Sequence, residues 1–297
     1  MIDPKAIVSY AQYREDLILL ALLLDVKKGY YVDIGANYPT IDSVTKLFYD
    51  KGWSGINVEP IKSLHEQLQK ERPRDTNLQC GIGSKAGEEA LFREYKNISG
   101  HSTFVDSQKE AHDESVESVD YKVQIQTLEQ IFNKYKPGHI NFLKIDVEGY
   151  EYEVIKGNNW LKYRPEVICI EANHIDKPWQ KILEQKNYKL FIHDGLNDYY
   201  VSKESWHRTD GFTERAIKID YHALRQHQWQ SWSADSNDIL RLNKIISNQK
   251  ININNLILDT QRLATAEQLS LKNRPYGSRI KRAIYGLTID WLRYKKG

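Results

Sequence analysis

The chain has 297 residues, of which 40% are hydrophobic and 11% aromatic, so it can bury a core and is not a disordered protein. Its net charge of +2 is unevenly distributed, because residues 272–297 carry eight Lys or Arg and one acid. The rest of the chain is therefore slightly acidic. This argues against a core that binds nucleic acid and for a basic tail with its own partner.

Two features indicate where the protein is found. The longest uncharged apolar run, residues 17–24, is too short to span a bilayer. The N-terminus has no basic segment followed by an apolar run and a cleavage site, so we expect a cytoplasmic protein. Cys80 and Cys169 fall in predicted strands, where buried free thiols are expected rather than a disulfide or a metal site.

The first predicted strand lies in residues 30–37. It runs through β-favouring residues into Asp33, and Gly35 follows before a helix-like run that begins at Asp42. A strand that ends in an acid and a glycine and leads into a helix is typical of the ligand crevice of a doubly wound α/β fold. Because Gly35 has no Cβ, we expect it to let the backbone approach a ligand closely.

The remaining pattern alternates strands and helices, as in a mostly parallel sheet. Strands are predicted at residues 55–58, 77–82, 121–126, 140–147, 167–170, 188–193 and 199–201, and helices at 61–71, 128–135, 150–156 and 178–186. Thr127 opens one of these helices with a capping-box sequence, and Ser9 is a candidate cap for a helix that packs Leu17 against the sheet. Residues 94–118 are polar and are expected to form a long loop.

Acidic residues recur where the predicted strands end: Asp33, Glu59, Asp146 and Glu171. Strand alternation also places Glu148 on the same side as Asp146. Carboxylates suit a ligand with hydroxyl and ammonium groups, whereas a dinucleotide requires the glycine-rich phosphate turn that this chain lacks. Glu59, in particular, is placed to bind a ribose diol. The pattern favours a nucleoside without phosphate, and S-adenosylmethionine fits it.

Several segments, taken together, resemble one family. The segments YVDIGANYP, GWSGINVEP, RPRDTNL, HSTF, FLKIDVEGYE and ICIEANH, preceded by SYAQYREDL, occur in the order and spacing of the FkbM family of S-adenosylmethionine-dependent methyltransferases, over residues 9–193. The resemblance implies a class I Rossmann-like fold with a mostly parallel, doubly wound sheet. It implies methylation of a hydroxyl, typically of sugars in polysaccharides, glycolipids or natural products. Arg14 stands where members usually carry Gly, and we expect little consequence.

The resemblance implies a set of residues around S-adenosylmethionine: Gln12, Glu15, Asp33, Gly35, Asn37, Glu59, Gly81, Ile82 and Asp146. Among these, Asp33, Gly35 and Asn37 line the methionine and ribose end, and Glu59 takes the ribose hydroxyls. Gly81 and Ile82 flank the adenine. Asp146 meets the methionine ammonium, and Gln12 and Glu15 close over the carboxylate or sulfonium side.

Removal of the proton from a sugar hydroxyl calls for a general base. The candidates are His174, Glu148, Glu171 and His101. His174 has a pKa near neutrality when unperturbed and is chemically the best placed. As an alternative, Glu148, Glu171, His174 and Asp146 could together hold a divalent metal. We expect no metal, since carboxylates that bind an ammonium group explain the acids.

The C-terminal part changes character. We place a methyltransferase domain at residues 1–225 and a helical basic extension at 226–297. Residues 279–294 form a basic amphipathic pattern, which suits either docking on the domain or a dimer partner, or peripheral binding to a membrane surface. The leading hypothesis is an O-methyltransferase of a cell-surface polysaccharide or glycolipid. The alternatives are a nucleotide-sugar or nicotinamide-dependent enzyme and a catalytically silent scaffold that acts through its tail. The oligomeric state, including a homo-oligomer, is open.

Overall fold

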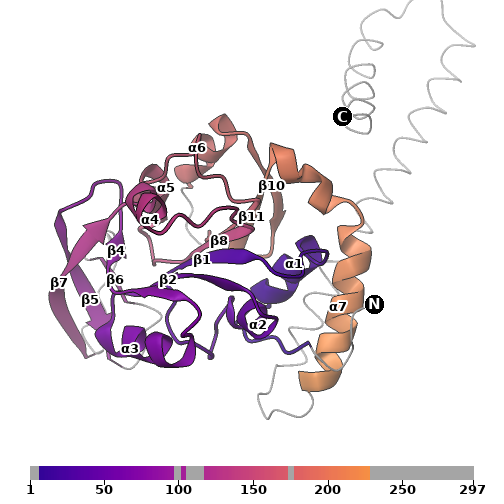
Figure 1. Cartoon of the computed structure of the whole chain (residues 1–297), viewed down its shortest axis with the longest axis horizontal. Coiled ribbons are helices and arrows are strands. Elements are labelled where there is room, and N and C mark those ends of the chain that lie inside the picture. The colour runs from indigo at the N-terminus through magenta and orange to yellow at the C-terminus, as the bar shows by residue number, and fades with distance from the viewer. Residues whose placement is uncertain (1–6, 97–101, 105–116, 173–176, 228–297) are drawn as a thin grey trace, which may run out of the picture. The chain divides into compact units, whose positions relative to one another are not determined.

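The computed structural model describes residues 7–96, 102–104, 117–172 and 177–227. The strands of its main sheet are β1 (Tyr30–Ile34), β2 (Ser54–Val58), β3 (Thr76–Leu78), β8 (Phe142–Ile145), β9 (Val167–Glu171), β10 (Tyr188–His193) and β11 (Asn197–Ser202). Their order across the sheet is β10-β11-β9-β8-β1-β2-β3 (Figure 1). The pairs from β9 through β3 are parallel, and β11 is antiparallel to both of its neighbours. The sheet is therefore mostly parallel, as expected.

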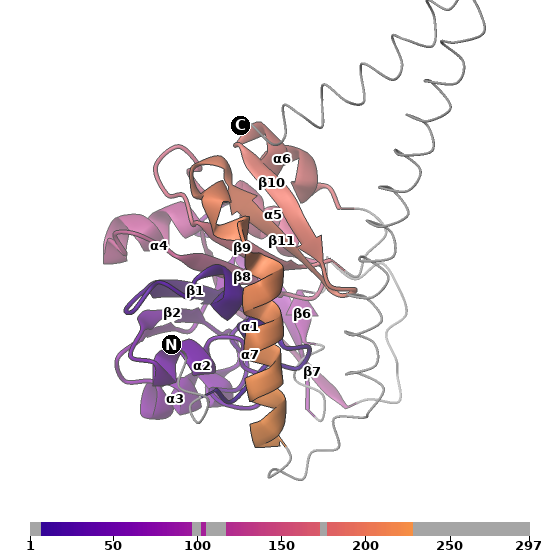
Figure 2. The ribbon, with the colours of Figure 1, turned by 90° about the vertical axis from the view of Figure 1, so that its right-hand side faces the viewer.

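Helices cover both faces of this sheet. They are α1 (Glu15–Leu22), α2 (Lys46–Asp50), α3 (Lys62–Glu71), α4 (Leu128–Tyr135), α5 (Glu151–Lys156), α6 (Trp179–Gln185) and α7 (Phe212–His227), with a 3-10 helix at Lys203–Thr209. On one face α4, α5 and α6 bury side chains such as Phe132 and Leu183. On the other, α1, α2 and α7 bury Leu19, Phe48 and Ile219, and Figure 2 shows α7 beside α1. The predicted capping box at Thr127 is confirmed.

A second, smaller sheet was not predicted. Its strands are β4 (Gly81–Ile82), β5 (Glu89–Tyr95), β6 (Thr103–Phe104) and β7 (Ser118–Gln126), in the order β4-β7-β5-β6. The single strand expected at 77–82 is wrong, since its first half pairs with β2 and its second half with β7. At the start of β4, Gly81 leaves space for the ring of Phe104, which a Cβ would overlap. The polar loop expected at 94–118 contains β6 and the start of β7.

The order of the strands locates a binding crevice. From β1 the chain builds outward through β2 and β3 on one side, and β8 and β9 then build outward on the other. The border between β1 and β8 is therefore a topological switch point, where open α/β sheets bind ligands beyond the carboxyl ends of the strands. Both of these strands are buried, and their register pairs Asp33 with Lys144.

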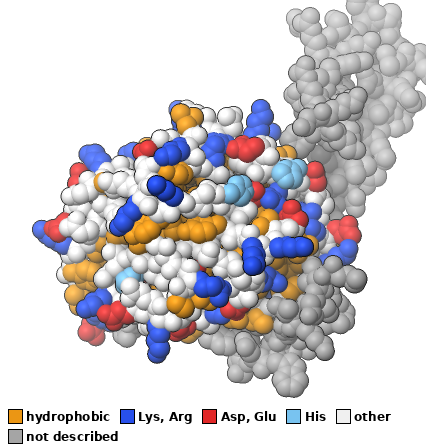
Figure 3. Space-filling view, viewed as in Figure 1, with side chains coloured by type: hydrophobic (Ala, Val, Ile, Leu, Met, Phe, Trp, Pro, Cys, Tyr) orange, Lys and Arg blue, Asp and Glu red, His pale blue; other side chains and the backbone are white. Residues whose placement is uncertain are grey.

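The structure bears on some of the remaining expectations and leaves others as predictions. The domain boundary at residue 225 remains a prediction, and the basic helix expected at 279–294 lies outside the described residues. In the described part of the chain, no helix is long and apolar enough to cross a membrane. On the face seen in Figure 3, basic and acidic side chains are interspersed.

Candidate active site

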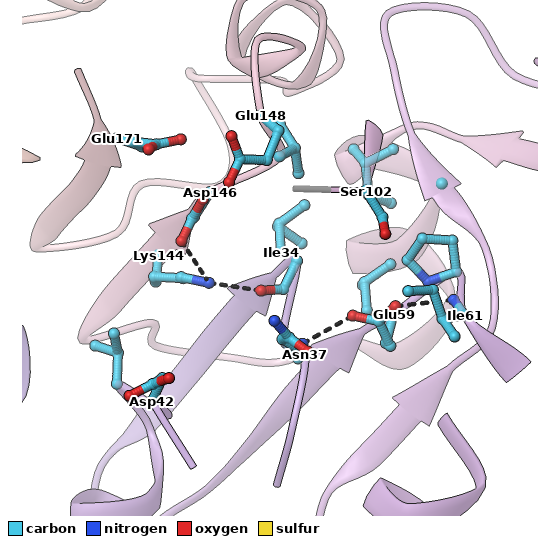
Figure 4. A pocket seen from close by; sticks show the side chains of 18 of the residues that line it. Ile34, Asn37, Asp42, Glu59, Ile61, Ser102, Lys144, Asp146, Glu148 and Glu171 are labelled. Carbon is cyan, nitrogen blue, oxygen red and sulfur yellow. Dashed lines mark hydrogen bonds and ion pairs between the residues drawn. The ribbon is translucent and has the colours of Figure 1, made fainter. Parts of the chain in front are cut away.

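A cavity of about 360 Å³ lies at the carboxyl ends of β1, β2, β8 and β9. Ten of the residues expected at the site line it: Gln12, Glu15, Gly35, Asn37, Glu59, Gly81, Ile82, Asp146, Glu148 and Glu171. Asp33 is not among its described lining residues, and His101 and His174 lie outside the described residues. Figure 4 shows Glu59 at one end and Glu171 at the other, with Asp146 between them. The crevice predicted from the strand ends is therefore present.

The cavity is strongly acidic. Six of its described lining residues carry a carboxyl group: Glu15, Asp42, Glu59, Asp146, Glu148 and Glu171. Lys144 is the lysine among the described lining residues. Its ammonium group is already paired with the carboxyl groups of Asp33 and Asp146. Where these carboxyl groups are ionised, the cavity attracts a cationic ligand and repels phosphate.

Glu59 is buried at the end of β2 and organises the turn after β1. One carboxyl oxygen accepts the N–H of Asn37 at 2.8 Å, and the other accepts the N–H of Ile61 at 2.8 Å. Asn37 has a φ of 52° in the left-handed region, which asparagine tolerates better than most residues. Burial raises the pKa of Glu59 to about 7. Each oxygen keeps a further lone pair that can accept a ligand hydroxyl.

Gly35 makes close contact with the protein itself. Its φ is 77°, and a Cβ at this position would overlap the carbonyl oxygen of Asp146. Gly35 also lines the cavity. The expectation that its missing Cβ serves the approach to a ligand is thus incomplete, because the end of β8 already occupies that space.

Asp33, which is expected to line the cofactor site, lies beneath the cavity and is not among its described lining residues. One carboxyl oxygen accepts the hydroxyl of Thr45 at 2.8 Å, and the other lies 3.3 Å from Nζ of Lys144. The same Nζ donates to the carbonyl of Gly35 at 2.6 Å and lies 3.5 Å from a carboxyl oxygen of Asp146. Burial opposes the charge of Lys144, but the two acids outweigh burial and raise its pKa. Asp33 therefore acts on the cavity through Lys144.

A fully buried arginine extends this polar chain. Arg72, at the end of α3, donates to the carbonyl of Pro39, to the hydroxyl of Ser43 at 2.9 Å and to that of Thr45 at 3.4 Å. It also lies 3.8 Å from the buried carboxyl of Asp75. These contacts hold residues 39–45 in an irregular loop, so the helix expected from Asp42 begins at Lys46. Through Arg72, the RPRDTNL segment thus supports the loop that contributes Asp42 and Val44 to the cavity wall.

Asp146, Glu148 and Glu171 form a carboxyl cluster. Each offers an oxygen within 4.8 Å of the others. Burial, followed by repulsion from Asp146, raises the pKa of both Glu148 and Glu171. Strand alternation does not explain this arrangement, because β8 ends at Ile145 and Glu148 has a φ of 53°. His174, the fourth member of the suggested metal site, lies outside the described residues, so the choice between a metal site and a site for an ammonium group stays a prediction.

The N-terminal segment closes another side of the cavity. Glu15 accepts the N–H of Tyr13 at 2.9 Å and the amide of Asn197 at 3.2 Å, and burial raises its pKa to about 7. Ser9 does not cap α1. Its hydroxyl donates to Asp16 at 2.8 Å, and Arg14 holds the N-cap position. Arg14 has a φ of 66°, a conformation that glycine adopts without strain, which accounts for the glycine expected there.

Several lining residues were not predicted. Lys144 had a signal in the sequence, since a charged residue within a nearly apolar strand calls for a buried partner. Phe92 and Phe104 lie in β5 and β6 of the second sheet, and Ser102 directly precedes β6. The positions of the two phenylalanines depend on strand pairings over long sequence separations. Two of these three residues, Ser102 and Phe104, belong to the HSTF segment.

Comparison with known proteins supports a methyltransferase. Over 193 residues the chain is 26% identical to methyltransferase sdnD of Sordaria araneosa, covering 54% of this chain and 74% of that protein. A family model described as the methyltransferase FkbM domain matches residues 33–199, a span that begins within β1 and contains the carboxyl cluster and most of the cavity lining. The chain belongs to the FkbM methyltransferase family.

Proposed function

We propose that this protein transfers the methyl group of S-adenosylmethionine to a hydroxyl oxygen. The observation that carries the proposal is the charge of the cavity, with six carboxyl groups and one engaged ammonium group among its described lining residues. S-adenosylmethionine presents a ribose diol, an ammonium and a sulfonium, and all of these gain from nearby carboxylates. A dinucleotide or nucleotide sugar would bring phosphates into the same acidic space.

The order of the strands suggests how the cofactor lies. The adenine would lie against Gly81, Ile82 and the aromatic wall of the second sheet, and Glu59 at the end of β2 would take the ribose hydroxyls. The methionine part would then pass over β1 and β8, where Asp146 faces its ammonium group. This direction leads the methyl group toward β9 and the carboxyl cluster.

The carboxyl cluster supplies candidates for the general base. In the reaction the acceptor oxygen forms a bond to the methyl carbon, the carbon–sulfur bond breaks with its electron pair left on sulfur, and the hydroxyl proton must leave. A carboxylate of Glu148 or Glu171 would take that proton, and a raised pKa makes each a stronger base than an exposed carboxylate. In-line positioning of the acceptor would supply much of the rate.

For the acceptor we propose a sugar hydroxyl of a polysaccharide or a glycolipid, the class that the family resemblance implies. An alcohol acceptor suits a cavity whose carboxyl groups can accept hydrogen bonds from several hydroxyls at once. The wall next to the carboxyl cluster includes Leu196 and the end of β9, and the acceptor would lie against this wall.

Calorimetric titration tests the cofactor. Wild-type protein is titrated with S-adenosylmethionine, S-adenosylhomocysteine and NAD in parallel. We expect both S-adenosyl compounds to bind and NAD to give no heat of binding. Binding of NAD without binding of S-adenosylmethionine would favour a nicotinamide-dependent enzyme, and binding of none of the three would favour a silent scaffold. Transfer of a labelled methyl group to a panel of glycans and glycolipids then identifies the acceptor.

A further inference from the structure

The loop between β8 and α5 carries two carboxyl groups of the cavity. It comprises residues 146–150, with Asp146 at its start and Glu148 in its middle. Glu148 has a φ of 53° and Gly149 a φ of 98°, so two successive residues lie in the left-handed region. A glutamate adopts this conformation only where its surroundings hold it there.

Two buried side chains hold the loop. Glu151, at the start of α5, accepts the N–H of Val147 at 3.2 Å and the N–H of Gly149 at 3.1 Å through a single carboxyl oxygen. Thr103, on β6 of the second sheet, donates its hydroxyl to the carbonyl of Glu148 at 2.7 Å. Glu151 is 0% exposed and Thr103 is 1% exposed, so water does not compete for either contact. Glu151 thus accepts hydrogen bonds from two N–H groups of the loop, and Thr103 donates one to a carbonyl of the loop.

We propose that Thr103 and Glu151 are positioning residues that clamp residues 146–149 and thereby place the carboxyl groups of Asp146 and Glu148 at the cavity. The clamp gives the second sheet a part in function, because its edge strand β6 reaches the loop through Thr103 and lines the cavity with Phe104. What the two carboxyl groups do there rests on the proposed methyl transfer. The clamp itself does not depend on that function.

Amide hydrogen exchange tests the clamp in the free protein. Thr103→Val keeps the shape of the side chain and suits a strand, but it removes the hydroxyl. We expect the amides of Val147, Glu148 and Gly149 to exchange about tenfold faster in this variant, since one hydrogen bond that holds the loop is lost. Thr103→Ser keeps the hydroxyl and should restore slow exchange.

Thr127→Val is the matched control. It removes a threonine hydroxyl that accepts the N–H of Gln130 at 3.1 Å in the cap of α4, and Thr127 is not among the described residues that line the cavity. Exchange at Gln130 should rise in this variant and exchange at the loop should not. Glu151→Gln keeps an acceptor oxygen but loses its charge, so loop exchange should rise by a smaller factor than in Thr103→Val. Wild-type exchange at the loop in both Thr103→Val and Glu151→Gln would overturn the proposal.

Binding of S-adenosylmethionine gives a second readout. We expect the dissociation constant to rise about tenfold in Thr103→Val, to return close to the wild-type value in Thr103→Ser, and to stay unchanged in Thr127→Val. Equal weakening in Thr103→Val and Thr127→Val would mean a general loss of stability and would overturn the positioning role. If wild-type protein does not bind S-adenosylmethionine, the proposed function fails, while hydrogen exchange still decides the clamp.

Discussion

A Cβ atom on Gly35 would overlap the main-chain carbonyl oxygen of Asp146. The turn after β1 and the backbone after β8 therefore approach each other too closely for a side chain at position 35. Lys144 strengthens the same junction by donating to the carbonyl of Gly35 at 2.6 Å. β1 and β8, which border the switch point, are thus in close contact directly beneath the cavity. This contact requires a glycine at position 35.

Gly35→Ala should abolish binding of S-adenosylmethionine and destabilise the fold. Gly87→Ala is the matched control, because Gly87 has a φ of 78° but no atom within 4 Å of a built Cβ. A left-handed alanine costs about 1–2 kcal/mol, so the control should lose roughly this amount of stability. Gly35→Ala should lose more, since the strand ends must also separate. Urea unfolding and calorimetry measure both effects, and equal losses with binding retained would contradict the prediction.

Lys144→Met should strongly destabilise the domain, because it leaves Asp33 buried without its cation. Breaking a buried ion pair by removing one partner costs about 3–5 kcal/mol. The double variant Lys144→Met with Asp33→Asn removes the stranded charge and should recover a large part of that loss. Urea unfolding of the four proteins in the cycle measures the coupling.

Lys218→Met is the control for that cycle. Lys218 forms an exposed pair with Glu214 at 2.7 Å, and exposed pairs contribute less than about 1 kcal/mol. A double variant as unstable as Lys144→Met alone would show that Lys144 stabilises the domain by packing and not through Asp33.

The central strands of the main sheet could be predicted because each of them is marked locally. Apolar runs that end in an acid or a glycine identify β1, β2, β8 and β9, and their order in the chain fixes a parallel sheet. The second sheet could not be predicted in this way. Phe92 and Phe104 lie opposite each other where β5 pairs with β6. The polar residues between these strands in the sequence do not indicate this pairing.

The site was predicted in outline for a similar reason. Glu59 and Asp146 come directly after strands, so topology alone brings them to one cavity. Asp33 shows the limit, because it lies within β1 and its side chain points toward Thr45 and Lys144 beneath the cavity. The direction of a side chain at a strand end depends on the last residue that keeps the strand conformation, which the sequence marks only to within a residue or two.

Glu59→Gln should weaken binding of S-adenosylmethionine by about tenfold or more. The glutamine has one acceptor oxygen where the carboxylate accepts the N–H groups of both Asn37 and Ile61, so the turn that shapes the cavity loses a hydrogen bond of about 1.5–3 kcal/mol. Glu66→Gln, at an exposed position on α3, is the control and should bind as wild type. Calorimetry compares the three proteins, and unchanged affinity in Glu59→Gln would exclude a role in binding.

The free domain should lose stability as the pH rises from about 5 to about 8. Burial raises the pKa of Glu15 and of Glu59 to about 7, so between their usual pKa of 4.5 and this value the folded state binds more protons than the unfolded chain. Their stabilising effect is complete below the lower value and is lost as the pH passes the higher one. Thermal unfolding across this range measures the trend, which Glu59→Gln should reduce. Stability that rises with pH would contradict it.

S-adenosylmethionine should bind more tightly as the pH rises over the same range, opposite to the trend in stability. The sulfonium and ammonium charges favour ionised carboxyl groups, and the raised pKa values of Glu59, Glu148 and Glu171 mean that binding must displace protons. S-adenosylhomocysteine has no sulfonium charge, so its affinity should depend less on pH. Calorimetry in buffers of different ionisation enthalpy counts the protons released. The same number for both ligands would show that the carboxyl groups do not respond to the sulfonium, and would place the methyl group away from the carboxyl cluster.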